Sequence, residues 1–226
     1  MDPIRIDVWS DVACPWCYIG KRRLESGISA FADAGDAPPV EVEFHSFELS
    51  PDMPAEFAGS AADFLAEHKG LPREQAAQMQ AQVAAIAAQD GLRYDFASQR
   101  PANTRKAHQV LHLAKQVGLD MQAAMKERLL AAHFVEGRHI GRDADLADLA
   151  AEVGLDRAET LAALADQRFA TAVDADIARA RQLGVGGVPF FVLDGRYGVS
   201  GAQPADLFAQ ALHQVVEDRA STVAGT

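Results

Sequence analysis

The sequence is short of basic residues, of cysteines and of long hydrophobic runs. Its 21 lysines and arginines stand against 32 aspartates and glutamates, so the formal net charge is −11 at pH 7. Nucleic-acid binding needs clustered basic side chains that neutralise phosphates, and this balance argues against nucleic acid as a partner. The one basic cluster, Lys21-Arg22-Arg23, is short and is interpreted as a solvated helix face.

No segment reaches the roughly 20 consecutive apolar residues that a membrane-spanning helix needs, because Gln, Asp and Glu interrupt the alanine-rich stretches. A strand pattern begins at Ile4 and leaves no room for a signal peptide before it. The sequence therefore predicts a cytoplasmic protein without a membrane segment, and it leaves open whether that protein is a monomer or a homodimer.

Only two cysteines are present, Cys14 and Cys17, with Pro15 and Trp16 between them. In a reducing compartment, a single pair at this spacing is more typical of catalysis or metal binding than of a structural disulfide. Pro15 falls where a first helical residue would lie, since its missing N–H costs nothing there. Cys17 shares a helical stripe with Leu24, Ile28 and Phe31, which predicts a buried Cys17 and a Cys14 at the exposed helix end.

The order of predicted elements indicates an α/β fold. Period-two patterns predict strands over 4–9 and 40–45, one on each side of the cysteine helix. The apolar run 188–193, the type I′ turn signal Asp194-Gly195 and the segment 196–200 predict a hairpin, and Pro204 opens a last helix. Helices are predicted over 60–68, 72–90, 101–117, 120–136, 143–152 and 157–183.

Without the helical block, the chain reads strand-helix-strand and then strand-strand-helix. This order predicts a thioredoxin-like fold with a large all-helical insertion. Residues 1–50 and 184–226 are expected to form one discontinuous domain, and residues 51–183 the insertion with its return helix.

These motifs resemble the DsbA-like thioredoxin-fold oxidoreductases, and within them the FrnE-like subfamily. The resemblance rests on the stretch from Ser10 through Cys14-Pro15-Trp16-Cys17 to Arg22, on Asn103-Thr104 with Ala107-His108, on Phe134 to Gly137, and on Gly184 to Pro189 followed by Ser200-Gly201-Ala202-Gln203. It spans most of the chain and implies a thiol–disulfide oxidoreductase that acts on protein or small thiol and disulfide substrates without a metal or other cofactor.

The chemistry assigns different tasks to the two thiols. A helix N-terminus stabilises a thiolate, so Cys14 is the expected nucleophile and Cys17 the thiol that resolves the mixed disulfide. Pro15 and Trp16 add no charge to support the thiolate, which predicts a mild oxidant. In a reducing cytoplasm the pair rests as the dithiol, and this favours reduction or isomerisation over net oxidation.

Four further positions are candidate site residues. By resemblance, Val188 precedes a cis Pro189 that faces the disulfide and docks the substrate chain. Asp7 is a candidate buried acid that relays the Cys17 proton, with a pKa raised by burial, or else part of a solvated strand face. His108 either overhangs the cysteines or serves packing and capping.

Two other functions stay open. Relatives with the same insertion, the kappa-class glutathione transferases and hydroxychromene-carboxylate isomerases, bind glutathione at positions that match Val188, Pro189, Ser200 and Gly201, so glutathione is open as a co-substrate. The other alternative is a zinc-stabilised binding module whose ligands are Cys14, Cys17, His108 and His112.

Overall fold

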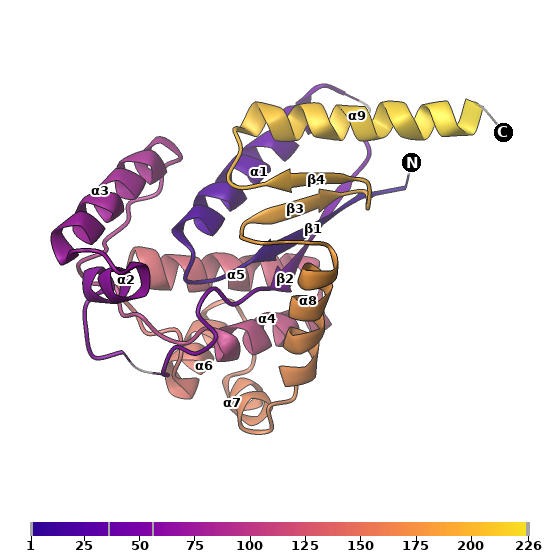
Figure 1. Cartoon of the computed structure of the whole chain (residues 1–226). Coiled ribbons are helices and arrows are strands. Elements are labelled where there is room, and N and C mark those ends of the chain that lie inside the picture. The colour runs from indigo at the N-terminus through magenta and orange to yellow at the C-terminus, as the bar shows by residue number, and fades with distance from the viewer. Residues whose placement is uncertain (1, 36, 56, 225–226) are drawn as a thin grey trace.

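The computed structural model describes residues 2–35, 37–55 and 57–224. At its centre lies a four-stranded sheet in the order β2-β1-β3-β4 (Figure 1). Its strands are β1 (Ile4–Ser10), β2 (Val40–Ser46), β3 (Phe190–Leu193) and β4 (Tyr197–Ser200). β1 pairs with β2 in parallel and with β3 antiparallel, and β3 and β4 form an antiparallel hairpin.

Helices α1 (Pro15–Asp33) and α9 (Ala205–Ala224) pack together over one face of the sheet (Figure 1). Alternate residues of β1 point toward them, and Ile6 and Val8 are at most 2% exposed. The two helices approach so closely that a Cβ at Gly27 would lie 2.7 Å from the Ala205 carbonyl oxygen. Glycine at this position therefore permits the helix contact that covers the sheet.

The opposite face of the sheet is covered by α8 (Ala170–Gln182). Trp9 of β1 is fully buried there, in one hydrophobic cluster with Ala180 and Val185. Because side chains alternate along β1, Asp7 points to this same face and away from α1. This alternation determines which side chains of β1 can reach the cysteines at the start of α1.

The other helices also lie between β2 and β3 in the chain. They are α2 (Ala61–Lys69), α3 (Arg73–Gln89), α4 (Arg105–Val117), α5 (Leu119–Phe134), α6 (Asp143–Glu152) and α7 (Arg157–Ala165). A shared apolar cluster holds α4 to α7 together and includes Leu111, Leu129 and Leu149. Among the described residues, no helix has the length and apolar character to cross a membrane.

The α/β fold with a thioredoxin-like core and a helical insertion is confirmed, whereas the division at 50/51 and 183/184 stays a prediction. One predicted helix, 157–183, is wrong because the chain turns between α7 and α8. Gln167 adopts a left-handed φ of 49° there, and Arg168 N–H donates to the Ala163 carbonyl at 3.0 Å. A glycine usually ends a helix in this way, so the sequence carried no stop signal.

The predicted hairpin turn is present, with left-handed φ values of 54° at Asp194 and 66° at Gly195. The return strand starts one residue later than predicted, at Tyr197.

Strand β2 lies at the edge of the sheet, and α5 covers that edge. The fully buried side chain of Gln122 accepts the Phe44 N–H at 3.0 Å and donates to the Phe44 carbonyl at 2.8 Å. One amide thus replaces a neighbouring strand at this residue and blocks pairing with another chain. The same contact fixes α5 against the sheet, close to the end of β1.

We predict that Gln122→Leu lowers the free energy of unfolding by about 2–4 kcal/mol, because both Phe44 backbone groups lose their buried partner. Urea denaturation followed by circular dichroism measures the change. Gln109→Leu is the matched control: this glutamine is also buried, but its Oε1 accepts no hydrogen bond from the described residues. Equal losses in the two variants would contradict the role given to Gln122.

Candidate functional site

The two cysteines lie at the start of α1, in the dithiol form. Cys14 is the N-cap residue, with extended backbone, and Cys17 N–H donates to its carbonyl at 3.1 Å. Cys17 is buried on the inner face of the helix, as predicted. Cys14 is also buried, only 3% exposed, so the expected exposed position is wrong. Trp16, at 38% exposure, is the outward-facing residue of the motif, and Pro15 is half-buried.

The pKa of Cys14 also differs from the expectation that the helix N-terminus stabilises its thiolate. Desolvation first, and then the neighbouring Cys17 sulfur, hold the pKa of Cys14 well above its usual value in the dithiol. A nearby carboxylate, Asp11, acts in the same direction. The backbone N–H of Cys17 lowers the pKa of Cys14, but this effect is smaller than burial and the Cys17 sulfur.

The strand opposite the cysteines approaches them through a cis peptide. The Val188–Pro189 bond is cis, as the resemblance implied, and the Val188 carbonyl oxygen lies 3.6 Å from Cys14 Sγ. Gly20 makes the approach possible, since a Cβ there would lie 2.9 Å from Pro189 Cγ. The Gly201 N–H donates to the Pro189 carbonyl at 2.8 Å, and Ser200 is exposed beside it. The structure therefore brings Val188 and the cis Pro189 to Cys14, and Gly201 lies beside Pro189 on the next strand, with Ser200 adjacent to it.

Residues of the helical insertion hold the segment that leads into α1. Tyr94 OH donates to the Pro15 carbonyl at 2.7 Å. Asp11 is 1% exposed and accepts hydrogen bonds from Leu49 N–H at 2.9 Å and from His108 Nε2 at 3.1 Å. Although burial alone would raise the pKa of Asp11, these bonds lower it, so the carboxylate stays charged. His108 thus bonds to Asp11 rather than to a cysteine, and it helps to hold the segment between β1 and α1.

Lys126 of α5 is a site residue that the sequence analysis missed. It is fully buried, its Nζ donates to the Ser10 carbonyl at 3.2 Å, and it interacts electrostatically with Cys17, Asp11 and Cys14. Burial lowers the pKa of Lys126 to about 8. A signal existed: Lys126 stands on the buried stripe of its helix, four residues from Gln122 and from Leu130.

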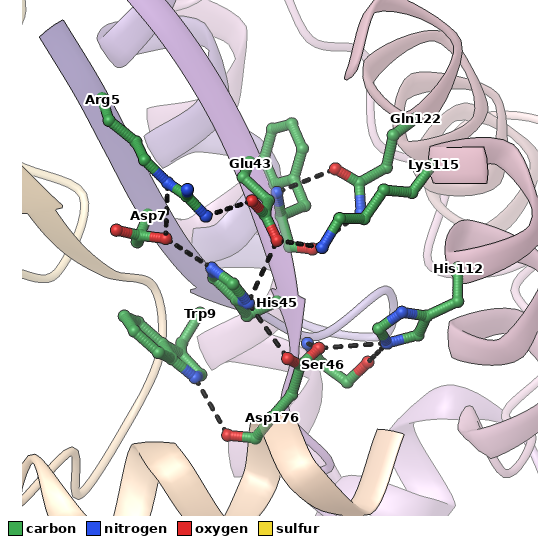
Figure 2. A network of polar contacts seen from close by, with 11 residues as sticks. Arg5, Asp7, Trp9, Glu43, His45, Ser46, His112, Lys115, Gln122 and Asp176 are labelled. Atoms are coloured by element: carbon green, nitrogen blue, oxygen red, sulfur yellow. Dashed lines mark hydrogen bonds and ion pairs between the residues drawn. The ribbon is translucent and has the colours of Figure 1, made fainter. Parts of the chain in front are cut away.

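Asp7 lies elsewhere. It is buried at 6% exposure on the sheet face opposite α1, where its Oδ1 contacts His45 Nε2 at 2.7 Å and Arg5 Nε at 3.4 Å (Figure 2). Burial would raise the pKa of Asp7, but His45 and Arg5 lower it, so the expected raised pKa is wrong. The period of two in β1 turns this carboxylate away from the cysteines, which excludes the direct relay considered for it.

Figure 2 shows the network around Asp7 extending to α8 and α4. Asp176 of α8 faces His45 Nδ1 at 3.0 Å, accepts the Ser46 N–H at 2.8 Å and lies 3.1 Å from His112 Nε2. Both ring nitrogens of His45 therefore face carboxylates. Burial would lower the pKa of His45, but hydrogen bonds to Asp176 and Asp7 raise it to about 9. The charged imidazole joins β1, β2 and α8.

The zinc ligand set is not assembled. His108 bonds to Asp11, and His112 bonds to Ser46 and Asp176 instead of approaching the cysteines. Within the described residues, the one group with metal-ligand spacing is Asp7, Glu43 and His45. Arg5 and Lys115 already pair with Glu43, so cations of the protein occupy this cluster.

A helix-tip dithiol opposite the carbonyl that precedes a cis proline is suited to thiol–disulfide exchange. Residues 5–213 match the DSBA-like thioredoxin domain. The chain belongs to this family.

Individual proteins that are similar to this chain agree with this family assignment. A crystal structure of a probable DsbA oxidoreductase, SCO1869 from Streptomyces coelicolor, is 41% identical, with a TM-score of 0.85 over 93% of this chain and 89% of that one. The uncharacterized protein YwbO of Bacillus subtilis (strain 168) is 29% identical over 92% of this chain and 96% of its own length.

Two more distant structures share the fold. The cytosolic disulfide reductase DsbM from Pseudomonas aeruginosa with GSH is 24% identical, with a TM-score of 0.61 over 93% of this chain and 98% of that one. A 2-hydroxychromene-2-carboxylate isomerase is 15% identical, with a TM-score of 0.68 over 96% and 98%. The family is thus shown, and the FrnE-like subfamily stays a prediction.

The His45 network predicts a pH-dependent stability. Because folding raises the pKa of His45 from 6.5 to about 9, its contribution is complete below pH 6.5 and is lost as the pH rises through 9. We expect His45→Gln to cost about 3 kcal/mol at pH 6, and the difference from wild type to shrink toward pH 9.5.

Urea denaturation of both proteins across this pH range measures the difference. His213→Gln, at an exposed position of α9, is the control and should cost far less stability at pH 6 than His45→Gln, because no buried carboxylate loses its partner. A His45→Gln deficit that is constant from pH 6 to 9.5 would show that His45 is not charged in the folded protein.

Proposed function

We propose that this protein is a cytoplasmic thiol–disulfide oxidoreductase that reduces or isomerises disulfides of protein or small-molecule substrates. The observation that carries the proposal is the 3.6 Å contact between Cys14 Sγ and the Val188 carbonyl, next to a cis Pro189. A substrate sulfur bound to Cys14 would lie at this strand. Extended substrate backbone would then have backbone hydrogen-bonding groups within reach.

The environment of Cys14 supports the reducing direction. A strong oxidant of this kind owes its potential to a stabilised reduced form, which means a stabilised thiolate. Here burial raises the pKa of Cys14, and the intervening Pro15 and Trp16 contribute no positive charge. The site therefore gives the thiolate little stabilisation. A reduced form that is not stabilised is oxidised easily, so the dithiol is a good electron donor.

In the proposed cycle, Cys14 attacks the substrate disulfide and forms a mixed disulfide while the first substrate thiol leaves. Cys17 then attacks Cys14, which releases the second substrate thiol and oxidises the pair. We further propose glutathione as a co-substrate that returns the pair to the dithiol. The bound GSH in DsbM supports this choice, as does the exposed Ser200, whose neighbour Gly201 bonds to the Pro189 carbonyl.

We predict that the wild-type protein catalyses insulin reduction and reactivation of scrambled ribonuclease, and that Cys14→Ala abolishes both activities. Cys17→Ala should instead accumulate the mixed disulfide, because it retains the nucleophile and lacks the resolving thiol. Varying the glutathione ratio in the same assays tests the co-substrate. Wild-type inactivity at every ratio would refute the redox function, and a potential well above about −200 mV would refute the reducing direction.

The raised pKa of Cys14 gives a separate prediction about reactivity. In the dithiol, Cys14 should react with iodoacetamide more slowly at pH 7 than an unhindered thiol, and its rate should still rise above pH 9. Mass spectrometry of peptides after timed alkylation resolves Cys14 from Cys17. A rate that levels off below pH 7 would indicate a stabilised thiolate and an oxidant instead.

A further inference from the structure

The helix that carries the cysteines also holds a turn next to Val188-Pro189, the docking segment of the proposed function. The cluster Lys21-Arg22-Arg23 predicts a solvated helix face, but the Arg23 side chain is only 19% exposed. We propose that Arg23 is a positioning residue that fixes the turn 200–203 and, through it, the docking segment. This inference rests on the proposed function, because it concerns how the same site binds an extended substrate.

The guanidinium of Arg23 joins α1 to the end of α3 and to the turn 200–203. Its Nε donates to the two carboxylate oxygens of Asp90, at 3.0 and 3.2 Å, and its Nη1 donates to the Ala202 carbonyl at 2.7 Å. Asp90 is the C-cap residue of α3, and Ala202 follows β4. Because a guanidinium presents its N–H groups in one rigid plane, the Asp90 carboxylate orients the group that binds the Ala202 carbonyl.

The turn 200–203 is stiffened by its own hydrogen bonds. Gln203 N–H donates to the Gly201 carbonyl at 2.9 Å, and the Gln203 side chain donates to the Ser200 carbonyl at 2.8 Å. Gly201 adopts a left-handed φ of 79°, and its N–H donates to the Pro189 carbonyl at 2.8 Å. A displacement of the turn therefore also displaces the Pro189 carbonyl.

Two residues of α1 thus hold the docking segment. Gly20 and Arg23 are three residues apart and lie on one face of the helix. Gly20 lets Pro189 approach the helix, and Arg23 holds the turn that bonds to Pro189. At the start of the same helix, Cys14 Sγ lies 3.6 Å from the Val188 carbonyl oxygen. One helix therefore carries the nucleophile and fixes the backbone that an extended substrate meets.

Loss of the Arg23 contacts should weaken substrate docking more than it changes the cysteines. Ala202 also packs against the apolar cluster that contains Tyr18 and Ile19, so the turn keeps its place in the fold without the guanidinium. Within the part of the chain that the structure describes, the hydrogen bonds of the Arg23 side chain go to Asp90 and Ala202 and not to a cysteine. An extended substrate needs the backbone groups beside Cys14, whereas a small disulfide needs only the Cys14 sulfur.

Two substrates of different size test the proposal. One is insulin, a polypeptide, reduced with dithiothreitol as the electron donor, and the other is dithionitrobenzoate, a small chromogenic disulfide. In Arg23→Met we expect KM for insulin to rise about 5- to 10-fold, as for the loss of one hydrogen bond, with kcat nearly unchanged. The rate with dithionitrobenzoate should stay close to the wild-type rate. Equal losses with both substrates, or no change in KM for insulin, would overturn the proposal.

Arg22→Met is the matched control, because Arg22 is the neighbouring residue of α1 and its guanidinium pairs with Glu25 and Glu127. It should leave KM for insulin close to the wild-type value. Arg23→Lys keeps the positive charge and lacks the planar guanidinium, so most of the increase in KM should remain. A wild-type KM in Arg23→Lys would show that the charge attracts the substrate, and the positioning role would fail.

Asp90→Ala tests whether the carboxylate acts through Arg23. It should raise KM for insulin as Arg23→Met does, and the double variant should be no worse than either single variant, because both changes remove the same contact. Additive increases in KM would contradict the role given to Asp90 as the group that orients Arg23.

Amide hydrogen exchange tests the link without a substrate. In Arg23→Met the Gly201 amide should exchange about 10-fold faster than in wild type, because the turn opens more easily. The Asp194 amide, which donates to the Arg5 carbonyl at 2.7 Å at the other end of the hairpin, is the internal reference and should keep its rate. Unchanged Gly201 exchange would overturn the role of Arg23. Faster Gly201 exchange in a protein whose wild type reduces neither substrate would refute the redox function instead.

Discussion

The short segment that leaves the end of β1 and enters α1 must satisfy its polar groups in a buried place. The Ser10 carbonyl accepts from Lys126, the Asp11 carboxylate accepts from His108, and the Pro15 carbonyl accepts from Tyr94. All three donors come from the helical insertion. The dithiol therefore has its geometry only when the insertion is folded onto the sheet, and the insertion is part of the site rather than a lid beside it.

The insertion is itself anchored on both sides of the site. Gln122 covers the edge of β2 through the two backbone groups of Phe44, and Asp176 attaches α8 to His45 and to the Ser46 N–H. Gln122 is fully buried, Asp176 is half-buried with its side chain 13% exposed, and both anchors are polar. Because unpaired buried polar groups are costly, they specify one arrangement of helices on the sheet and thereby one position for Lys126.

Burial has opposite consequences for the two kinds of reactive group in the site. It raises the pKa of the Cys14 thiol and lowers that of the Lys126 amine, because in each case the charged form is disfavoured. The buried site therefore keeps the Cys14 thiol protonated and brings the titration of the Lys126 amine close to neutral pH.

Local patterns in the sequence were sufficient for most elements of the fold: the period of two in β1, the Pro15 helix start and the Asp194-Gly195 turn predicted them. That Val188-Pro189 meets the cysteines was implied by the resemblance to the DsbA-like family. The local signals depend on backbone geometry, which neighbouring residues determine. Only the tertiary structure decided that Cys14 is buried, that Asp7 faces away from the cysteines and that Lys126 reaches the Ser10 carbonyl. Burial and charge depend on segments more than 100 residues apart in the chain, as with Lys126 and Ser10, and no local pattern records which segments meet.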